Sequence, residues 1–279
     1  MIRPHQTTVA DKAKQARREV LKMIHKAQTS HVASNFSVID IATVLYEQLN
    51  HDLVYDNDGF NEKPGGHDAD LVVWSKGWAA ASAYYFLAQA GYIPEKDLKK
   101  FPNAPYLGLA ETTVPGILCN GGAVGHGTPI AVGLALGKKK AKYKGNVYCI
   151  MSDGELNEGT VWESAMMAVH LGLDNLVFIV DGNKWQAMGK TSDVCKLDAC
   201  RAFEGFGWDV NRVDGHDHEQ LRIAFNRTRL NGLPEQGNPM FIFCDTIKGK
   251  GVSFMENHLL YHYKNVDDET FKEAMKELV

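Results

Sequence analysis

Oxygen-bearing side chains follow two apolar segments of the chain. Asp153 and Gly154 lie just past the apolar segment 146–151, and Asn183 lies just past the segment 176–181. A carboxylate and an amide oxygen suit a hard divalent cation that also takes phosphate oxygens, because the phosphates bring most of the negative charge. Gly154 would let the backbone approach a phosphate closely. The residue types therefore predict a site for magnesium and a diphosphate.

The spacing agrees with this prediction but leaves a simpler alternative open. Asp153 and Asn183 are 183 − 153 = 30 residues apart, which leaves room for a turn, a helix and a strand. A helix that begins near Glu158 would point its first N–H groups at the same place. However, Asp-Gly and Asp-Gly-Asn are ordinary turn sequences, and an acid near a helix N-terminus is favourable for dipole reasons alone. The residues by themselves do not say which diphosphate would bind.

The segments that must position these residues alternate between apolar runs and helical patterns. Almost wholly apolar or β-branched strands, separated by long helical crossovers, are typical of a parallel sheet covered on both faces. Such sheets bind ligands at the carboxyl ends of their strands. The predicted fold is α/β, a single domain over 1–279 with a doubly wound, mostly parallel sheet, helices on both faces and an N-terminal helical section. We expect strands at 71–74, 146–151, 176–181, 208–213 and 240–245, helices at 10–28, 37–49 (with Ser37 as a cap), 78–90, 128–141, 158–172, 195–205 and 217–230, and a loop at 57–70.

The bulk composition excludes several classes of function. The chain has 279 residues, 44% of them hydrophobic, which is enough for a sizeable core. Its net charge of −4 gives no basic field for nucleic acid or for an acidic membrane surface. The five cysteines are an odd number without a C-x-x-C pair, which indicates reduced thiols. Without an apolar signal core or a membrane-length apolar segment, we expect a soluble, cytoplasmic protein.

A long, ordered set of motifs resembles a known family. The stretch SDGELNEGTVWESAMMAVHLGLDNLVFIVDGNKWQ, residues 152–186, resembles the thiamine-diphosphate fingerprint that runs from GDG to a terminal Asn. More narrowly, it is similar to the transketolase version, GDGELNEG-x-x-WEA followed by NL-x-x-x-x-D-x-N. The segments TSHVASNFS, SKGW, PGILCNGGAVGHG and IKGKGVSF…YHY resemble further turns of that family, in the same order. The resemblance covers almost the whole chain.

This resemblance implies thiamine diphosphate and Mg²⁺ as cofactors and assigns roles to individual residues. Without it, Lys248 between glycines could lie in a solvated turn, and a lone histidine is usually structural. The implied metal ligands are Asp153, Asn183 and the backbone oxygen of Trp185. The implied cofactor contacts are Gly122, Ala123, Val124, Gly154, Glu155, Asn183, Lys248, His262 and Trp78. The implied substrate contacts are His31, Ser34 and His262. The implied catalytic residues are His31, His262, Glu158 and Glu163. The two glutamates match acidic residues that lie between the two active sites of a dimer.

Three positions depart from the family pattern. Ser152 replaces the first glycine of the fingerprint. Trp78 stands where SKGH would place a histidine near the diphosphate, and Leu109 stands where a His-Pro-Glu turn usually supplies a substrate histidine. Tryptophan and leucine cannot make those polar contacts. Either the enzyme handles a different ketose, or other residues compensate.

The resemblance also implies a partner chain and a reaction. The family pairs this domain with a pyrimidine-binding domain, which nothing here matches, so we expect it on a separate C-terminal subunit in an α2β2 assembly; a truncated chain is the alternative. The implied reaction transfers a two-carbon ketol unit from a ketose, or ketose phosphate, to an aldose. The rival interpretations are a decarboxylating relative, such as a 2-oxo-acid dehydrogenase first component or a deoxyxylulose-phosphate synthase, and a non-catalytic binding subunit. The ELNEG-x-x-WE stretch favours transketolase over the decarboxylating relatives.

Overall fold

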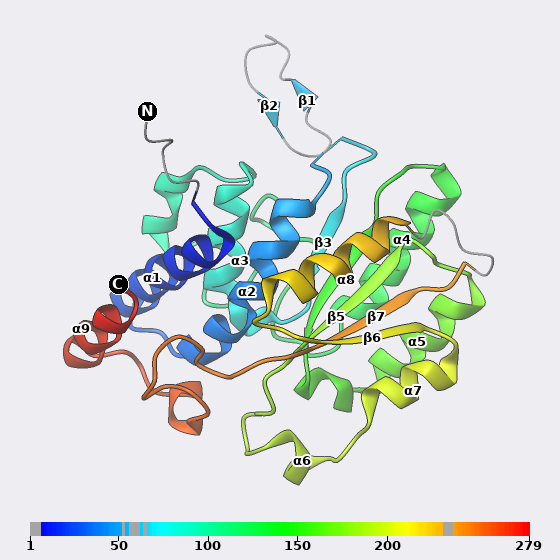
Figure 1. The fold of residues 1–279 in the computed structure, drawn as a ribbon. Helices are drawn as coiled ribbons and strands as arrows, with labels where there is room; N and C mark the ends of the chain where they lie inside the picture. The colour runs from blue at the N-terminus through cyan, green and yellow to red at the C-terminus, as the bar shows by residue number, and fades with distance from the viewer. Residues whose placement is uncertain (1–6, 52–53, 56–61, 64–65, 231–236) are drawn as a thin grey trace, which may run out of the picture.

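The chain is built on one parallel sheet, shown in the ribbon of a computed structural model (Figure 1). The strand order is β3-β4-β5-β7-β6, and every neighbouring pair runs parallel. The strands are β3 (Leu71–Trp74), β4 (Val147–Ser152), β5 (Leu176–Gly182), β6 (Asp209–Asp214) and β7 (Met240–Asp245). The structure describes residues 7–51, 54–55, 62–63, 66–230 and 237–279.

Alternating side chains along the strands divide the interior into two cores. In β4, Tyr148 and Ile150 face one core, whereas Cys149 and Met151 face the other, because successive side chains of a strand point to opposite faces. The first core is covered by α1 (Val9–Ala27), α2 (Val32–Gln48), α3 (Ala80–Gln89) and α8 (His218–Leu230), and the second by α4 (Gly127–Ala141), α5 (Gly159–His170) and α7 (Ala199–Phe206). This arrangement confirms the predicted parallel sheet with helices on both faces.

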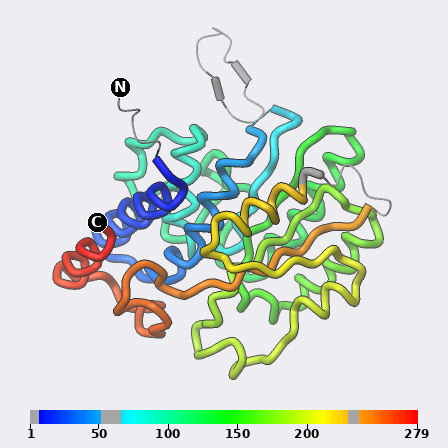
Figure 2. The backbone as a smooth tube through the Cα atoms, in the orientation of Figure 1, coloured from blue at the N-terminus to red at the C-terminus, as the bar shows by residue number. Residues whose placement is uncertain are grey.

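The first and last helices meet on the first face. Helix α9 (Asp268–Glu277) packs against α1, where the rings of His25 and Phe271 stack with centroids 4.2 Å apart. Figure 2 shows the first and last helices side by side. The N-terminal helical section is therefore closed by the C-terminal helix.

The predicted strand 208–213 is present as the edge strand β6, but it is less buried than the apolar character of the predicted strands implies. Asp209, Asn211 and Arg212 are at least partly exposed. Among the described strands, β6 pairs with β7 alone and forms the edge of the sheet, where its polar side chains remain in reach of solvent. The central strand β5, in contrast, is buried along its whole length, as the apolar run 176–180 predicts for most of it.

The prediction that Ser37 caps the second helix was also wrong. Helix α2 begins earlier, at Val32, and His31 occupies its N-cap with a φ of 69°. Ser37 is fully buried inside the helix, where its hydroxyl donates to the carboxylate of Asp181 at 2.6 Å. Because α2 is buried on nearly all sides, its polar residues make hydrogen bonds inside the protein. The polar residues in 34–37 therefore belong to the helix and do not mark a turn before it.

The remaining connections differ in length and include long segments, such as 90–126 between α3 and α4. The predicted helix 195–205 is instead α7, preceded by the single turn α6 (Thr191–Val194). Half of the predicted loop 57–70 lies outside the described residues; its described parts include β2 (Glu62–Lys63), which pairs with β1 (Val54–Tyr55). Turns of 3-10 helix lie at Gly77–Ala79, Glu95–Lys100, Gly154–Asn157 and Leu259–His262. Among the described residues, no helix has the length and apolarity to cross a membrane.

Candidate active site

The ends of β4 and β5 bring the predicted metal ligands to one place. Ser152 pairs with Asp181 in the sheet, and the backbone N–H of Asp153 donates to the carbonyl of Asp181 at 3.3 Å. The N–H of Lys184, directly after Asn183, donates to Asp153 Oδ2 at 2.6 Å. The side chains of Asp153 and Asn183 are therefore neighbours at the carboxyl edge of the sheet, as the strand order predicts.

Asp153 is a buried carboxylate at this edge of the sheet. It is 3% exposed, and its oxygens accept from the N–H groups of Gly154 and Lys184 and from the hydroxyl of Thr191. Burial, and then the nearby charge of Asp181, raise the pKa of Asp153 to about 6. Among the described residues no lysine or arginine forms an ion pair with it. A divalent cation would relieve this unbalanced charge.

The donor set around Asp153 fits magnesium held together with phosphates. The amide oxygen of Asn183 accepts from the N–H of Trp185 at 3.1 Å and has a second lone pair for a metal. Across the described parts of the chain, no three His, Cys, Asp or Glu side chains gather to hold a metal ion. An ion here would draw its other ligands from phosphate, backbone and water oxygens, which suits Mg²⁺.

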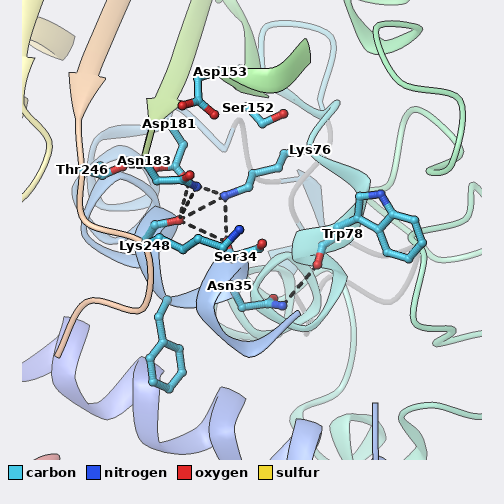
Figure 3. Close-up of polar contacts among 12 residues, drawn as sticks. Ser34, Asn35, Lys76, Trp78, Ser152, Asp153, Asp181, Asn183, Thr246 and Lys248 are labelled. Atoms are coloured by element: carbon cyan, nitrogen blue, oxygen red, sulfur yellow. Dashed lines mark hydrogen bonds and ion pairs between the residues drawn. The ribbon is translucent and has the colours of Figure 1, made fainter. Parts of the chain in front are cut away.

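A second buried carboxylate, Asp181, is neutralised by a lysine that sequence reasoning did not single out. Lys76 Nζ forms an ion pair with Asp181 and donates to the carbonyl of Ser34 at 2.7 Å (Figure 3). Asp181 also accepts from the hydroxyls of Ser37 and Thr246. Lys76 lies in the SKG turn directly after β3, so the rule that directed attention to Asp153 would also have found it.

A cavity of about 220 Å³ lies beside these strand ends. Its lining includes the glycine loop, where Gly122 has a φ of 107° that other residues rarely adopt. Gly77 lies so close to the loop that a Cβ there would meet Gly121 Cα at 2.7 Å. The predicted cofactor residues that line it are Gly122, Ala123, Val124, Gly154, Glu155, Asn183, Trp78 and His262, joined by Ser34, Trp185 and Glu158.

Two histidines face each other beside this cavity. The rings of His31 and His262 have centroids 4.8 Å apart, and Lys248 Nζ donates to His262 Nδ1 at 2.6 Å. Burial and then the charge of Lys248 lower the pKa of His31 to about 4 and that of His262 to about 3. Both rings are therefore neutral near pH 7. Because His262 Nδ1 accepts, its proton is on Nε2.

Some of the expected residues are placed differently from the rest. Lys248 is fully buried and lies outside the cavity lining, so the alternative of a solvated turn is wrong. Burial and then Lys76 lower its pKa to about 8.

Glu155 is also buried, and its carboxylate accepts from Ser75 and from backbone N–H groups. Glu163 is exposed on α5, outside the cavity lining. The catalytic and cofactor roles of these residues stay predictions.

Two of the three departures from the family pattern, Trp78 and Leu109, share an adjoining cavity of about 360 Å³. Trp78 packs against His31 with ring centroids 4.3 Å apart, and Leu109 is part of the same lining. None of the described side chains that line this cavity belongs to Lys, Arg, Asp or Glu. It is a neutral space directly beside His31.

Comparison with known proteins identifies the family. The family model described as transketolase, thiamine diphosphate binding domain, matches residues 9–278. This chain belongs to the transketolase family. One subunit of the apulose-4-phosphate transketolase of Actinobacillus succinogenes is 35% identical over 277 residues, which are 96% of this chain and 94% of that protein. The 6-deoxy-6-sulfo-D-fructose transketolase subunit SqwG of a Clostridium species is 33% identical, over 94% of this chain and 93% of that protein.

Solved transketolases share the fold. The transketolase of Campylobacter jejuni superposes with a TM-score of 0.86 at 27% identity, covering 97% of this chain and 42% of that one. The chain thus spans about two fifths of the solved transketolase chain, but almost the whole length of the relatives named as subunits. The sequence-based identification of a transketolase N-terminal, thiamine-diphosphate-binding unit is confirmed.

Proposed function

We propose that this chain is the N-terminal subunit of a two-chain transketolase that uses thiamine diphosphate and Mg²⁺. The observation that carries the proposal is the pair Asp153 and Asn183, brought together by neighbouring strands beside a glycine-lined cavity. Asp153, Asn183 and the backbone of Trp185 would hold the ion, and Gly154 and Lys248 would face the diphosphate. The uncompensated carboxylate of Asp153 supports the need for a cation.

In this proposal the protein residues bind, orient and exchange protons. When bound, thiamine diphosphate supplies the nucleophilic carbon and the electron sink for breaking the C–C bond next to a ketose carbonyl. His262 is held by Lys248 with Nε2–H free to donate to a substrate oxygen. His31 is neutral and can accept a proton from a substrate hydroxyl. Ser34 lies in the cavity lining with His262.

We propose a ketose that differs from the usual pentose phosphates. The cavity beside His31 is lined by Trp78 and Leu109, which stand where the family has two histidines. Among the described lining residues, none is Lys, Arg, Asp or Glu. It suits an uncharged part of a sugar, so a phosphate or another anionic group on the substrate would be held outside this cavity. The names of the relatives, which refer to apulose 4-phosphate and 6-deoxy-6-sulfo-D-fructose, support a non-standard ketose.

We further propose that a separate C-terminal subunit completes the site in an α2β2 assembly in the cytoplasm. Two of the relatives are named as subunits, which supports a partner. Val124 lines the cavity yet is 42% exposed, so one wall faces outward. Glu158 at the start of α5 and Glu163 about one turn later would approach a second copy. The five free cysteines support a reducing compartment.

The test is reconstitution with the partner chain, thiamine diphosphate and Mg²⁺. We expect ketol transfer between sugars, and we expect Asp153→Ala to abolish it. Asp174→Ala, at a partly exposed position outside the cavity lining, should leave it unchanged. Calorimetry with and without Mg²⁺ should show metal-dependent binding of the cofactor.

Decarboxylation of pyruvate instead of ketol transfer would favour the decarboxylating relatives. If the complete assembly does not bind thiamine diphosphate, the chain is instead the non-catalytic binding subunit of the rival interpretation.

A further inference from the structure

A buried charged cluster lies behind the active site and outside its cavities. Asp40 of α2 accepts from Arg17 Nη2 at 2.5 Å, from His216 Nδ1 at 2.6 Å and from His218 Nε2 at 2.9 Å. Asp40 is 4% exposed and Arg17 is 6% exposed. The cluster joins α1, α2 and the turn between β6 and α8, and the proposed chemistry gives it no role.

His216 connects this cluster to the loop that carries Lys248. Its Nδ1 faces the Asp40 carboxylate, which can only accept, and its Nε2 accepts from the backbone N–H of Ile247 at 2.9 Å. The ring is therefore a neutral imidazole with its proton on Nδ1. Asp40 and Ile247 are joined through one side chain in a fixed tautomer.

The loop is held to α2 on both sides of Lys248. Ile247 is linked to Asp40 through His216, and the N–H of Gly249 donates directly to the carbonyl of Ala33 at 3.0 Å. Lys248 lies between these two amides, with its ammonium group on His262 Nδ1. Two tethers that flank one residue restrict its backbone more than either tether alone.

Arg17 supports the same loop by packing. A Cβ built on Gly251 would lie 3.0 Å from Arg17 Cδ, and the φ of Gly251 is 97°. Gly215, next to His216, lies even closer to the start of the loop, because a Cβ there would meet Thr246 Cγ2 at 2.4 Å. The cluster and the loop 246–251 therefore form one packed unit.

We propose that His216 is a positioning residue: through Asp40 and the Ile247 amide it fixes the backbone of Lys248, and so places the lysine for the diphosphate and for His262. This inference rests on the proposed function for the role of Lys248. It assigns to the Asp40–His216 pair a task in cofactor binding, although neither residue lines the cofactor cavity.

The chain offers a matched control for the test. His218 also donates to Asp40, but among the described residues no hydrogen bond links it to the loop 246–251. His216→Ala and His218→Ala each remove one partner of the same carboxylate, so a general loss of stability should affect both variants. His216→Gln retains an acceptor for the Ile247 amide and should rescue part of the effect.

Two measurements separate positioning from stability. In the cofactor-free chain, amide hydrogen exchange of the peptide 246–251 should accelerate by about tenfold in His216→Ala and stay near wild type in His218→Ala. In the complete assembly with Mg²⁺, affinity for thiamine diphosphate should fall by about tenfold in His216→Ala, the scale of one lost hydrogen bond. Affinity for thiamine, which has no diphosphate, should not change.

The outcomes are distinct. Unchanged exchange in His216→Ala, equal effects of His216→Ala and His218→Ala, or an equal loss for thiamine and thiamine diphosphate would each overturn the inference. If the wild-type assembly does not bind thiamine diphosphate, the proposed function fails instead, and the exchange measurement still decides whether His216 holds the loop.

Discussion

At the residue scale, two buried aspartates at the ends of neighbouring strands have opposite electrostatic environments. Asp181 is fully buried, forms an ion pair with Lys76 and accepts hydrogen bonds from hydroxyl groups. Asp153 accepts only from neutral donors among the described residues, and its pKa is raised. The first arrangement is that of a structural ion pair, and the second is that of a group suited to bind a cation.

Replacing Lys76 should therefore be costly. In Lys76→Met the carboxylate of Asp181 loses its cation but remains buried, and we expect the free energy of unfolding to fall by about 3 to 5 kcal/mol. Adding Asp181→Asn to that variant should recover part of the loss, because the unpaired charge is then removed. Urea unfolding of the single and double variants checks this. A double variant no more stable than Lys76→Met would show that charge is not the cause.

The neutral state of His31 predicts a pH dependence of stability. Burial and then Lys248 lower the pKa of His31 to about 4 from 6.5. Below pH 6.5 the unfolded chain takes up a proton that the folded chain does not bind until about pH 4, so His31 makes the folded state progressively less stable over that range. Relative to His31→Asn, wild type should lose free energy of unfolding as the pH falls through this range. A difference that is constant with pH would contradict the assignment.

At the element scale, the glycine loop before α4 is shaped by contacts that exclude a side chain. Gly125 has a φ of 83°, and a Cβ there would lie 2.6 Å from Thr160 Oγ1 and 2.8 Å from Glu158 Cβ. Its N–H donates to the buried Glu155. The loop, the turn after β4 and the start of α5 are thus fitted to one another.

Gly125→Ala should displace these segments together. We expect a loss of more than about 1 kcal/mol in the free energy of unfolding, because the backbone conformation and the space both exclude a methyl group. Gly133→Ala is the matched control: Gly133 lies within α4 with open space where a Cβ would lie, and alanine there should be neutral or stabilising by roughly 0.5 to 1 kcal/mol. Thermal unfolding of the two variants gives the comparison, and equal stabilities would contradict the argument.

Sequence reasoning succeeded for elements whose pattern has one interpretation. The fully buried β5 and the strand ends that carry Asp153 and Asn183 follow from unbroken apolar runs and helical crossovers. It failed at α2, where Ser37 resembles a cap but binds Asp181 across 144 residues of sequence. A side-chain contact of that range leaves no local signal. The burial of Lys248 also left no local signal, because the residues beside it contact α2 and the turn at His216, which are distant in sequence.

At the scale of the whole molecule, the site is assembled from segments that follow different strands. Lys76 follows β3, Asp153 follows β4, Asn183 follows β5 and Lys248 follows β7. Such a site exists only when the sheet is complete, so cofactor binding and folding should be linked. The substrate and the partner chain could not be predicted from these elements, because strand and helix patterns carry no signal for which ligand or protein binds at the surface.

This linkage predicts how the cofactor affects stability. With Mg²⁺ present and thiamine diphosphate at about 100 times its dissociation constant, the free energy of unfolding should rise by about 2.7 kcal/mol. Omitting Mg²⁺, or replacing Asp153 by Ala, should remove most of this gain. Thermal unfolding monitored by fluorescence is a suitable measurement. A gain that is the same without Mg²⁺ would contradict the role given to Asp153 and Asn183.

The outward-facing rim at Val124 has a consequence for the order of assembly. Because that side of the cavity is open to water, we expect thiamine diphosphate to enter and leave it freely. If the proposed partner chain covers this rim, the bound coenzyme would be enclosed and we expect its release to slow. We therefore expect loading to precede pairing, and we expect a surplus of this chain in a cell to behave as a reversible reservoir of the coenzyme.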